Sequence, residues 1–271
     1  MTSVHSTSLL VARSEINNSG QGSNQAWRYH VAGTGTLPLL LLSGSLGANA
    51  GTAELLSELL PGIRIIVPEY APVRSMDECV QALNSILKVE GVDRTAVLGG
   101  SFGGLIAQFW THRNPDRVTH LILSGTAPPD PSRLTNHSRA IRILPLIPFP
   151  LVRLLLQILL KKLLRGVNEP RWRQEYSKLI ASLSKEDLRS RYRLAMDFDR
   201  NDHLSDLPKS VNVLILEGDR DRVVASSIHE RLRQVYAQNV SHVFEGSGHS
   251  PAMTHPEEWS AVVGSFLKPL S

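Results

Sequence analysis

The sequence predicts an α/β protein with a mostly parallel central sheet, helices on both faces of that sheet, and an inserted helical cap. Apolar runs typical of strands alternate with segments of helical periodicity along most of the 271 residues. Strands that are separated by helices pair in parallel and are covered on both faces. Residues 128–206 interrupt this alternation, because they are rich in Pro, Leu and Arg and show no clear strand.

The strands are predicted in chain order. Residues 8–13 and 26–31 are expected to form an N-terminal hairpin around a polar, flexible turn at 17–24. Residues 37–42 are an almost unbroken apolar run, which a strand buried on both faces requires. Further strands are predicted at 63–67, which Pro68 should end, and at 95–98, 118–123, 211–216 and 241–244.

The helices are predicted from capping residues and from the spacing of apolar side chains. Ser75 and Glu78 form a capping-box pattern at the start of a helix over 75–88, and Ser227 with Glu230 repeats it. Pro256 suits the first turn of the final helix. We therefore predict a core made of residues 1–127 and 207–271, with the helical cap of residues 128–206 between two core strands.

The composition excludes several classes of protein. The single cysteine, Cys79, allows no internal disulfide and is expected to be a buried, unreactive thiol in a helix. The sequence contains no Cys/His cluster typical of a metal site, and we expect no cofactor. It shows neither a secretory signal nor an apolar run of about eighteen residues, so we expect a cytoplasmic location.

The stretch Gly99-Gly100-Ser101-Phe102-Gly103-Gly104 carries the strongest functional signal. It contains G-x-S-x-G between a predicted strand and a predicted helix. A serine on such a sharp turn presents its hydroxyl above the sheet, and glycines let the backbone turn without side-chain clashes. We therefore predict that Ser101 is a nucleophile; the alternative is an ordinary tight turn.

A serine nucleophile needs a base, and the base needs an orienting acid. After this kind of turn the acid comes next in the chain and the histidine last. The strand at 211–216 runs into two candidate acids, Asp219 and Asp221, and the strand at 241–244 runs into His249. His255 is a weaker candidate base, because its position fits a helix cap.

These motifs together make the chain resemble the α/β-hydrolase superfamily over almost its full length. The resemblance rests on G-x-S-x-G, on G-x-x-D at 218–221 and on G-x-G-H at 246–249. It implies the α/β-hydrolase fold, with Asp221 as the acid and His249 as the base of a Ser-His-Asp triad. A serine nucleophile disfavours the dehalogenase and epoxide-hydrolase branches, which have aspartate at that position.

The oxyanion of such a reaction needs two donors, usually backbone N–H groups. One is expected from Phe102, at a helix start where the dipole favours negative charge. The resemblance places the other at Ser45, in the turn Ser43-Gly44-Ser45. Ser43 stands where family members commonly have histidine, so the support of this donor differs. The alternative is that this turn is simply flexible.

Residues 65–124 also resemble the maspardin branch of the superfamily. The matching pieces are residues 68–73, Asp77-Glu78-Cys79, the turn around Ser101 and residues 121–123. This resemblance implies a non-catalytic binding or adaptor protein with an incomplete triad. The chain departs from that pattern because it retains both Asp221 and His249.

The cap is basic and rich in leucine. Residues 130–205 contain fifteen Lys or Arg and eight Asp or Glu, and in residues 149–165 cations interrupt a leucine-rich run. We expect a lid helix packed on the core; peripheral contact with a membrane surface, or with a partner, is the alternative. The basic excess lacks interleaved aromatic residues, which disfavours nucleic-acid binding.

The sequence thus predicts a serine esterase that works through an acyl-enzyme. A leucine-rich cap above the serine favours an apolar acyl group and therefore a lipophilic small-molecule ester. Cleavage of thioesters, lactones or C–C bonds uses the same groups and stays an alternative, as does the non-catalytic adaptor.

Overall fold

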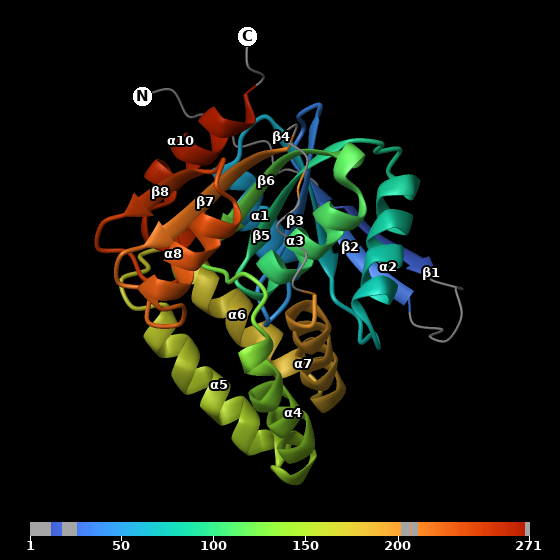
Figure 1. Ribbon diagram of the computed structural model, residues 1–271, viewed down its shortest axis with the longest axis vertical. Helices are drawn as coiled ribbons and strands as arrows, with labels where there is room; N and C mark the ends of the chain where they lie inside the picture. The colour runs from blue at the N-terminus through green and yellow to red at the C-terminus, as the bar shows by residue number, and fades with distance from the viewer. Residues whose placement is uncertain (1–11, 18–25, 202–206, 208–210, 269–271) are drawn as a thin grey trace.

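An eight-stranded sheet runs through the computed structural model, which describes residues 12–17, 26–201, 207 and 211–268 (Figure 1). The strand order is β1-β2-β4-β3-β5-β6-β7-β8. β2 pairs antiparallel with β1 and β4, and the other neighbours pair in parallel. The strands are β1 (Ala12–Asn17), β2 (Ala26–Ala32), β3 (Leu37–Leu42), β4 (Ile63–Glu69), β5 (Thr95–Gly100), β6 (Val118–Ser124), β7 (Asn212–Gly218) and β8 (Val240–Phe244).

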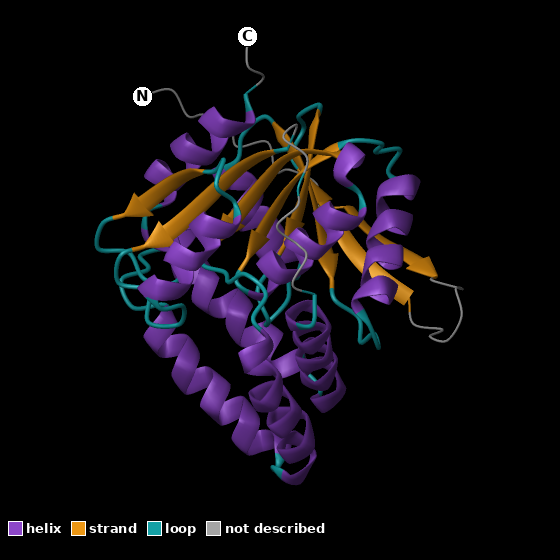
Figure 2. Cartoon of the chain, viewed as in Figure 1, coloured by secondary structure: helices purple, strands orange, loops and turns teal. Residues whose placement is uncertain are grey.

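Helices cover both faces of the sheet and fill the insertion between β6 and β7 (Figure 2). The helices are α1 (Ala50–Leu59), α2 (Met76–Val89), α3 (Phe102–Arg113), α4 (Leu134–Ile143), α5 (Phe149–Leu163), α6 (Pro170–Ser182), α7 (Lys185–Asp199), α8 (Ser226–Val235), α9 (Pro251–Thr254) and α10 (Pro256–Leu267). Short 3₁₀ helices occur at Pro115–Arg117, Pro131–Arg133 and Leu144–Leu146.

Two apolar cores lie on opposite faces of the sheet. Leu40 and Leu42 of β3 pack with side chains of α2, α3 and α8, whereas Leu39 and Leu41 pack with those of α1 and α10. Successive strand residues point to opposite faces, so a strand between two such layers must be apolar throughout. This confirms the predicted α/β fold with a mostly parallel sheet.

The insertion α4–α7 lies beyond the carboxyl ends of the parallel strands (Figure 1). Ser190 of α7 is tied to the core, because its hydroxyl bonds both the N–H and the carbonyl of Val73 at 2.8 Å. Glu175 of α6 accepts a bond from the Asn49 side chain at 3.0 Å, at the start of α1. Among the described helices, none has both the length and the apolar character needed to cross a bilayer.

Several predicted boundaries are wrong. The first strand of the hairpin, β1 (Ala12–Asn17), continues past residue 13, where it was predicted to end; residues 8–11 and most of the predicted turn lie outside the described residues. Pro68 does not end β4, which continues to Glu69. Beyond Ile66, β4 pairs with β2 alone. Pro68 lacks an N–H group, but at this position β4 makes no hydrogen bonds to β3 that would need it.

The two capping predictions also differ from the structure. Ser75 does accept a bond from the Glu78 N–H at 3.2 Å, but the Glu78 carboxylate bonds the Arg74 N–H instead of completing the box. α8 begins after Ala225, without a side-chain cap, so Ser227 lies inside its first turn. The prediction for Cys79 is confirmed as to burial, and burial raises the pKa of its thiol to about 12.

Candidate active site

Ser101 lies on the turn from β5 to α3 and is the only described non-glycine residue with positive φ. Its φ of 52° and ψ of −121° are unfavourable for a residue with a Cβ, so its surroundings must hold this conformation. The Ser101 N–H donates to the carbonyl of Ser124, and the Ser101 carbonyl accepts from Thr126 Oγ1, both at 2.8 Å. These bonds fix the strained turn against the end of β6.

The glycines around Ser101 are required by close contacts. A Cβ on Gly99 would lie 2.5 Å from the carbonyl oxygen of Gly103. A Cβ on Gly103 would lie 2.0 Å from the carbonyl oxygen of Leu42. Both distances are far below van der Waals contact, so α3 approaches β3 and β5 this closely only because these positions are glycine.

Asp221, after β7, and His249, after β8, form a buried hydrogen-bonded pair. His249 Nδ1 lies 2.8 Å from Asp221 Oδ2, while Asp221 Oδ1 accepts from the N–H groups of Val223 and Val224. Burial by itself raises the pKa of Asp221, but the bonds from His249, Val224 and Val223 outweigh it and lower that pKa below its ordinary value. The ionised carboxylate holds a proton on Nδ1, which leaves Nε2 as the acceptor nitrogen.

The turn Ser43-Gly44-Ser45 lies beside Ser101. A Cβ placed on Gly44 would be 3.6 Å from Ser101 Cβ. The turn has a defined shape, because Tyr70 Oη donates to the Ser43 carbonyl at 2.8 Å and the Gly47 N–H donates to the Gly44 carbonyl at 2.9 Å. Phe102 begins α3, so its N–H has no partner within the helix. Both predicted donor residues therefore flank Ser101.

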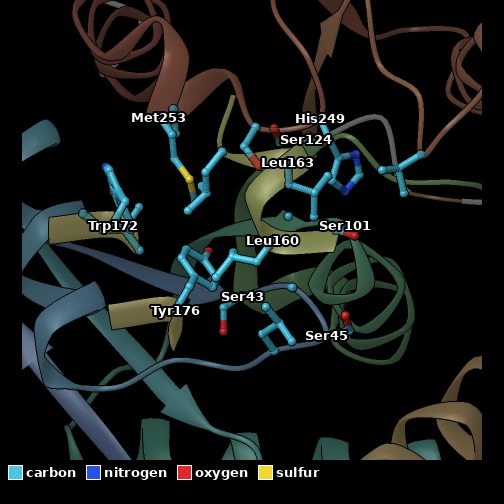
Figure 3. Close-up of a pocket in the computed structure, with 18 of the residues that line it drawn as sticks. Ser43, Ser45, Ser101, Ser124, Leu160, Leu163, Trp172, Tyr176, His249 and Met253 are labelled. Atoms are coloured by element: carbon cyan, nitrogen blue, oxygen red, sulfur yellow. The ribbon is translucent and has the colours of Figure 1, made fainter. Parts of the chain in front are cut away.

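Ser101 and His249 line one cavity between the sheet and the cap, the Ser101 cavity (Figure 3). Figure 3 shows Leu160, Trp172 and Met253 around it. In the described structure the Ser101 hydroxyl and the His249 ring are not hydrogen-bonded to each other, whereas His249 is bonded to Asp221. The distance between a catalytic serine and its histidine is often long when no substrate is bound. The Ser101 cavity is lined by apolar side chains and by nine further residues: Ser43, Gly44, Ser45, Gly100, Ser101, Ser124, Tyr176, His249 and Ser250. No described Asp, Glu, Lys or Arg lines it.

The sequence did not single out the charged layer behind Asp221. His229 of α8 is buried, with Nε2 3.7 Å from Asp221 Oδ2 and Nδ1 3.6 Å from Glu217 Oε2. Arg233, one turn later on α8, forms an ion pair with Glu217. Burial alone raises the pKa of Glu217, but His229 and Arg233 outweigh it and lower that pKa. The only sequence signal was the i, i+4 spacing of His229 and Arg233, which occurs on many helices.

The rival site candidates have other contacts. Asp219 Oδ1 accepts a bond from the Gly246 N–H at 2.7 Å and supports the loop after β8. His255 precedes α10, and its carbonyl accepts from the Trp259 N–H at 2.9 Å, as its predicted capping position requires. The described residues contain no group of three or more His, Cys, Asp or Glu suited to a metal ion.

A second cavity lies on the other side of the turn around Gly47, and we call it the Arg191 cavity. Its lining includes Arg191 of α7, together with Arg28, Glu69 and Lys178. Nε and Nη1 of Arg191 are buried and have no hydrogen-bond partner among the described residues. Burial lowers the pKa of Arg191, although the charge of Asp187 acts against this. Leu46 borders both cavities, which makes them neighbours.

Comparison with known proteins gives a consistent picture. The sequence profile described as "Alpha/beta hydrolase family" matches residues 25–262. A 2-hydroxy-6-oxononadienedioate/2-hydroxy-6-oxononatrienedioate hydrolase of Dechloromonas aromatica is 24% identical, over 88% of this chain and 89% of that protein. A pimeloyl-[acyl-carrier protein] methyl ester esterase of Photobacterium profundum is 26% identical, over 85% of this chain and 94% of that protein. A thermophilic esterase from Thermogutta terrifontis has a similar structure, with a TM-score of 0.73 and 22% identity over 94% of this chain and 98% of that one.

Proposed function

The chain belongs to the alpha/beta hydrolase family, and from that premise we propose that it is a serine hydrolase that cleaves carboxylic esters with an apolar acyl group. The observation that carries the proposal is the placement of the strained Ser101 turn and the Asp221-supported His249 on one uncharged cavity. An uncharged, mainly apolar cavity favours a neutral, apolar acyl group.

The proposed reaction proceeds through an acyl-enzyme. Ser101 Oγ attacks the acyl carbon while His249 Nε2 takes the hydroxyl proton and then gives it to the leaving alkoxide. Asp221 keeps the imidazole in the required tautomer and stabilises it when it is protonated. The N–H groups of Phe102 and Ser45 hold the oxyanion. Water then attacks the acyl-enzyme, His249 takes its proton, and the acid leaves as that proton returns to Ser101.

A second candidate is C–C bond hydrolysis of a dicarboxylate; the Dechloromonas relative is named as a hydrolase of such a dicarboxylate. The Arg191 cavity favours it, because the lining of that cavity includes a guanidinium, whose positive charge suits a carboxylate. The Ser101 cavity counts against it, since its lining offers no cation for either carboxylate. We therefore rank ester cleavage first.

A fluorophosphonate probe tests the nucleophile. The native protein should be labelled, Ser101→Ala should abolish labelling, and His249→Ala should nearly do so. Absence of labelling under conditions that label a control hydrolase would contradict catalysis and favour the non-catalytic adaptor suggested by the maspardin resemblance.

A panel of p-nitrophenyl esters then tests the acyl preference. Octanoyl esters should be cleaved with a higher kcat/KM than acetyl esters, and Arg191→Gln should leave this preference unchanged. If instead dicarboxylate substrates are cleaved best and Arg191→Gln raises their KM, the C–C hydrolase is the better assignment.

A further inference from the structure

Helix α5 carries an apolar face on each of two sides. On the inner side Val152 and Leu160 are buried, and Leu160 and Leu163 line the Ser101 cavity. On the outer side five residues are each between 45 and 56% exposed: Leu151, Leu154, Leu155, Ile158 and Leu159. Their spacing of three and four residues places them in one row along the helix, which we call the α5 stripe.

The α5 stripe lies at the edge of the molecule. Figure 1 shows α5 along the outer border of the helical insertion, away from the sheet. Ile143 and Leu146, in the segment that leads into α5, are 50 and 81% exposed. Monomeric proteins rarely expose a large contiguous apolar surface unless it binds something. The position of the α5 stripe and its five adjacent exposed apolar side chains therefore indicate an interaction surface.

The charges beside the α5 stripe select its partner. Lys161, Lys162 and Arg165 are exposed at its C-terminal end, and no described carboxylate lies within ion-pair distance of them. α5 itself contains no Asp or Glu. An apolar helix face edged by cations and free of acids is typical of a helix that lies in the interface of an anionic bilayer. A second copy of the chain fits less well, because its α5 offers these cations no carboxylate.

The α5 stripe also continues into the Ser101 cavity. Leu159 is half-exposed on the outer side and lines the cavity, where Leu160 and Leu163 are its neighbours on α5. An apolar molecule that leaves a lipid surface at α5 therefore meets apolar side chains as far as Ser101.

We propose that α5 docks this protein on an anionic phospholipid surface and that its substrate is a lipophilic ester taken from that surface. The docking follows from the face of α5 alone. The source of the substrate rests on the proposed function as an ester hydrolase.

Vesicle co-sedimentation of the full chain tests the docking. The unmodified protein should bind vesicles of phosphatidylglycerol and phosphatidylcholine, more weakly at high salt and more weakly still without phosphatidylglycerol. The double change Leu154→Glu, Leu155→Glu should lower the partition coefficient at least about tenfold. The double change Lys161→Gln, Lys162→Gln should lower it about 30-fold.

Val89→Glu is the matched control, because Val89 is 64% exposed and ends α2, which Figure 1 shows apart from α5 on the other side of the molecule. It should bind vesicles like the unmodified protein. All variants should keep the melting temperature and the rate on soluble p-nitrophenyl acetate, because the changed side chains are exposed. A long-chain ester embedded in anionic vesicles should be cleaved more slowly by the Leu154→Glu, Leu155→Glu variant and by the double lysine variant, but not by Val89→Glu.

Three results would overturn the docking: no binding of the unmodified protein to anionic vesicles, an equal loss of binding for Val89→Glu, or a dimer in light scattering that the Leu154→Glu, Leu155→Glu variant dissociates while no form binds vesicles. The inactive Ser101→Ala variant separates docking from catalysis, since it should bind vesicles like the unmodified protein. If both bind but the unmodified protein cleaves no ester, the proposed function fails and the docking stands. If soluble esters are cleaved but nothing binds vesicles, the docking alone fails.

Discussion

Replacing Asp221 by asparagine should reverse the hydrogen bond that orients His249. Asp221 Oδ1 accepts from the N–H groups of Val223 and Val224, so in Asp221→Asn the amide oxygen should keep that place. The amide NH₂ then faces His249 Nδ1, where Asp221 Oδ2 now lies at 2.8 Å. Because an amide NH₂ donates, Nδ1 must accept, and the ring proton moves to Nε2. Nε2 then cannot take the proton of Ser101.

The expected loss in kcat is about 10³- to 10⁴-fold, which corresponds to about 4–5.5 kcal/mol of transition-state stabilisation. The assay is hydrolysis of a p-nitrophenyl ester near neutral pH, with urea unfolding to verify that the variant is folded. The free energy of unfolding should change much less than the activation free energy, because the side chain keeps its shape and its backbone bonds.

Asp219→Asn is the matched control for this change. Asp219 follows the same strand, but within the described chain its carboxylate accepts a hydrogen bond only from the Gly246 N–H. The kcat of Asp219→Asn should therefore stay within a few-fold of the unmodified protein. The reasoning is refuted if Asp221→Asn keeps more than about a tenth of the activity, a loss below about 1.4 kcal/mol. It is refuted equally if Asp219→Asn is the more damaging change.

Three further predictions concern stability and reactivity. The lowered pKa of Asp221 contributes stability that is complete above its unfolded value of about 3.9 and is lost as pH falls through its folded value. Below a pH of about 4, the free energy of unfolding should therefore fall more steeply for the unmodified protein than for Asp221→Asn, as measured by urea unfolding; parallel curves would contradict this. Gly99→Ala should lower the free energy of unfolding by about 1–3 kcal/mol or more, because the new Cβ would lie 2.5 Å from the Gly103 carbonyl oxygen. A Cβ on Gly100 would meet nothing within 4 Å, so urea unfolding of Gly100→Ala should give a free energy within about 0.5 kcal/mol of the unmodified protein. Cys79 should not react with a thiol reagent in the native protein, because burial raises its pKa to about 12, and should react fully after unfolding.

The sequence was informative wherever structure and chemistry depend on residues that are close together in the chain. Local patterns predicted the order of strands and helices, as the apolar run at 37–42 did for β3. Local patterns also predicted the site, through the glycines around Ser101 and the loop motifs that end at Asp221 and His249. Element boundaries were less well predicted. Pro68 continues β4 because β3 no longer pairs with it there, and no local pattern contains that information.

The site shows the same division. Sequence order and a family resemblance distinguished Asp221 from Asp219, but the 2.8 Å bond to His249 exists because β7 and β8 are neighbours in the sheet. Tyr70 supports the Ser43 carbonyl, and His229 lies behind Asp221, through packing between elements distant in the chain.

The amino-acid sequence by itself predicted the fold class and the serine turn, because backbone periodicity and covalent spacing encode these features locally. It offered Asp219 or Asp221 as the acid and His249 as the base, and the family resemblance chose Asp221. It also showed that α5 is leucine-rich and basic, but leucines occur around most of this helix, so periodicity did not reveal which of them face solvent. Only the tertiary structure decided that, because burial depends on what α6 and the strand ends cover. The same packing made the cavity at Ser101 uncharged and left Leu159 on both its wall and the outer surface.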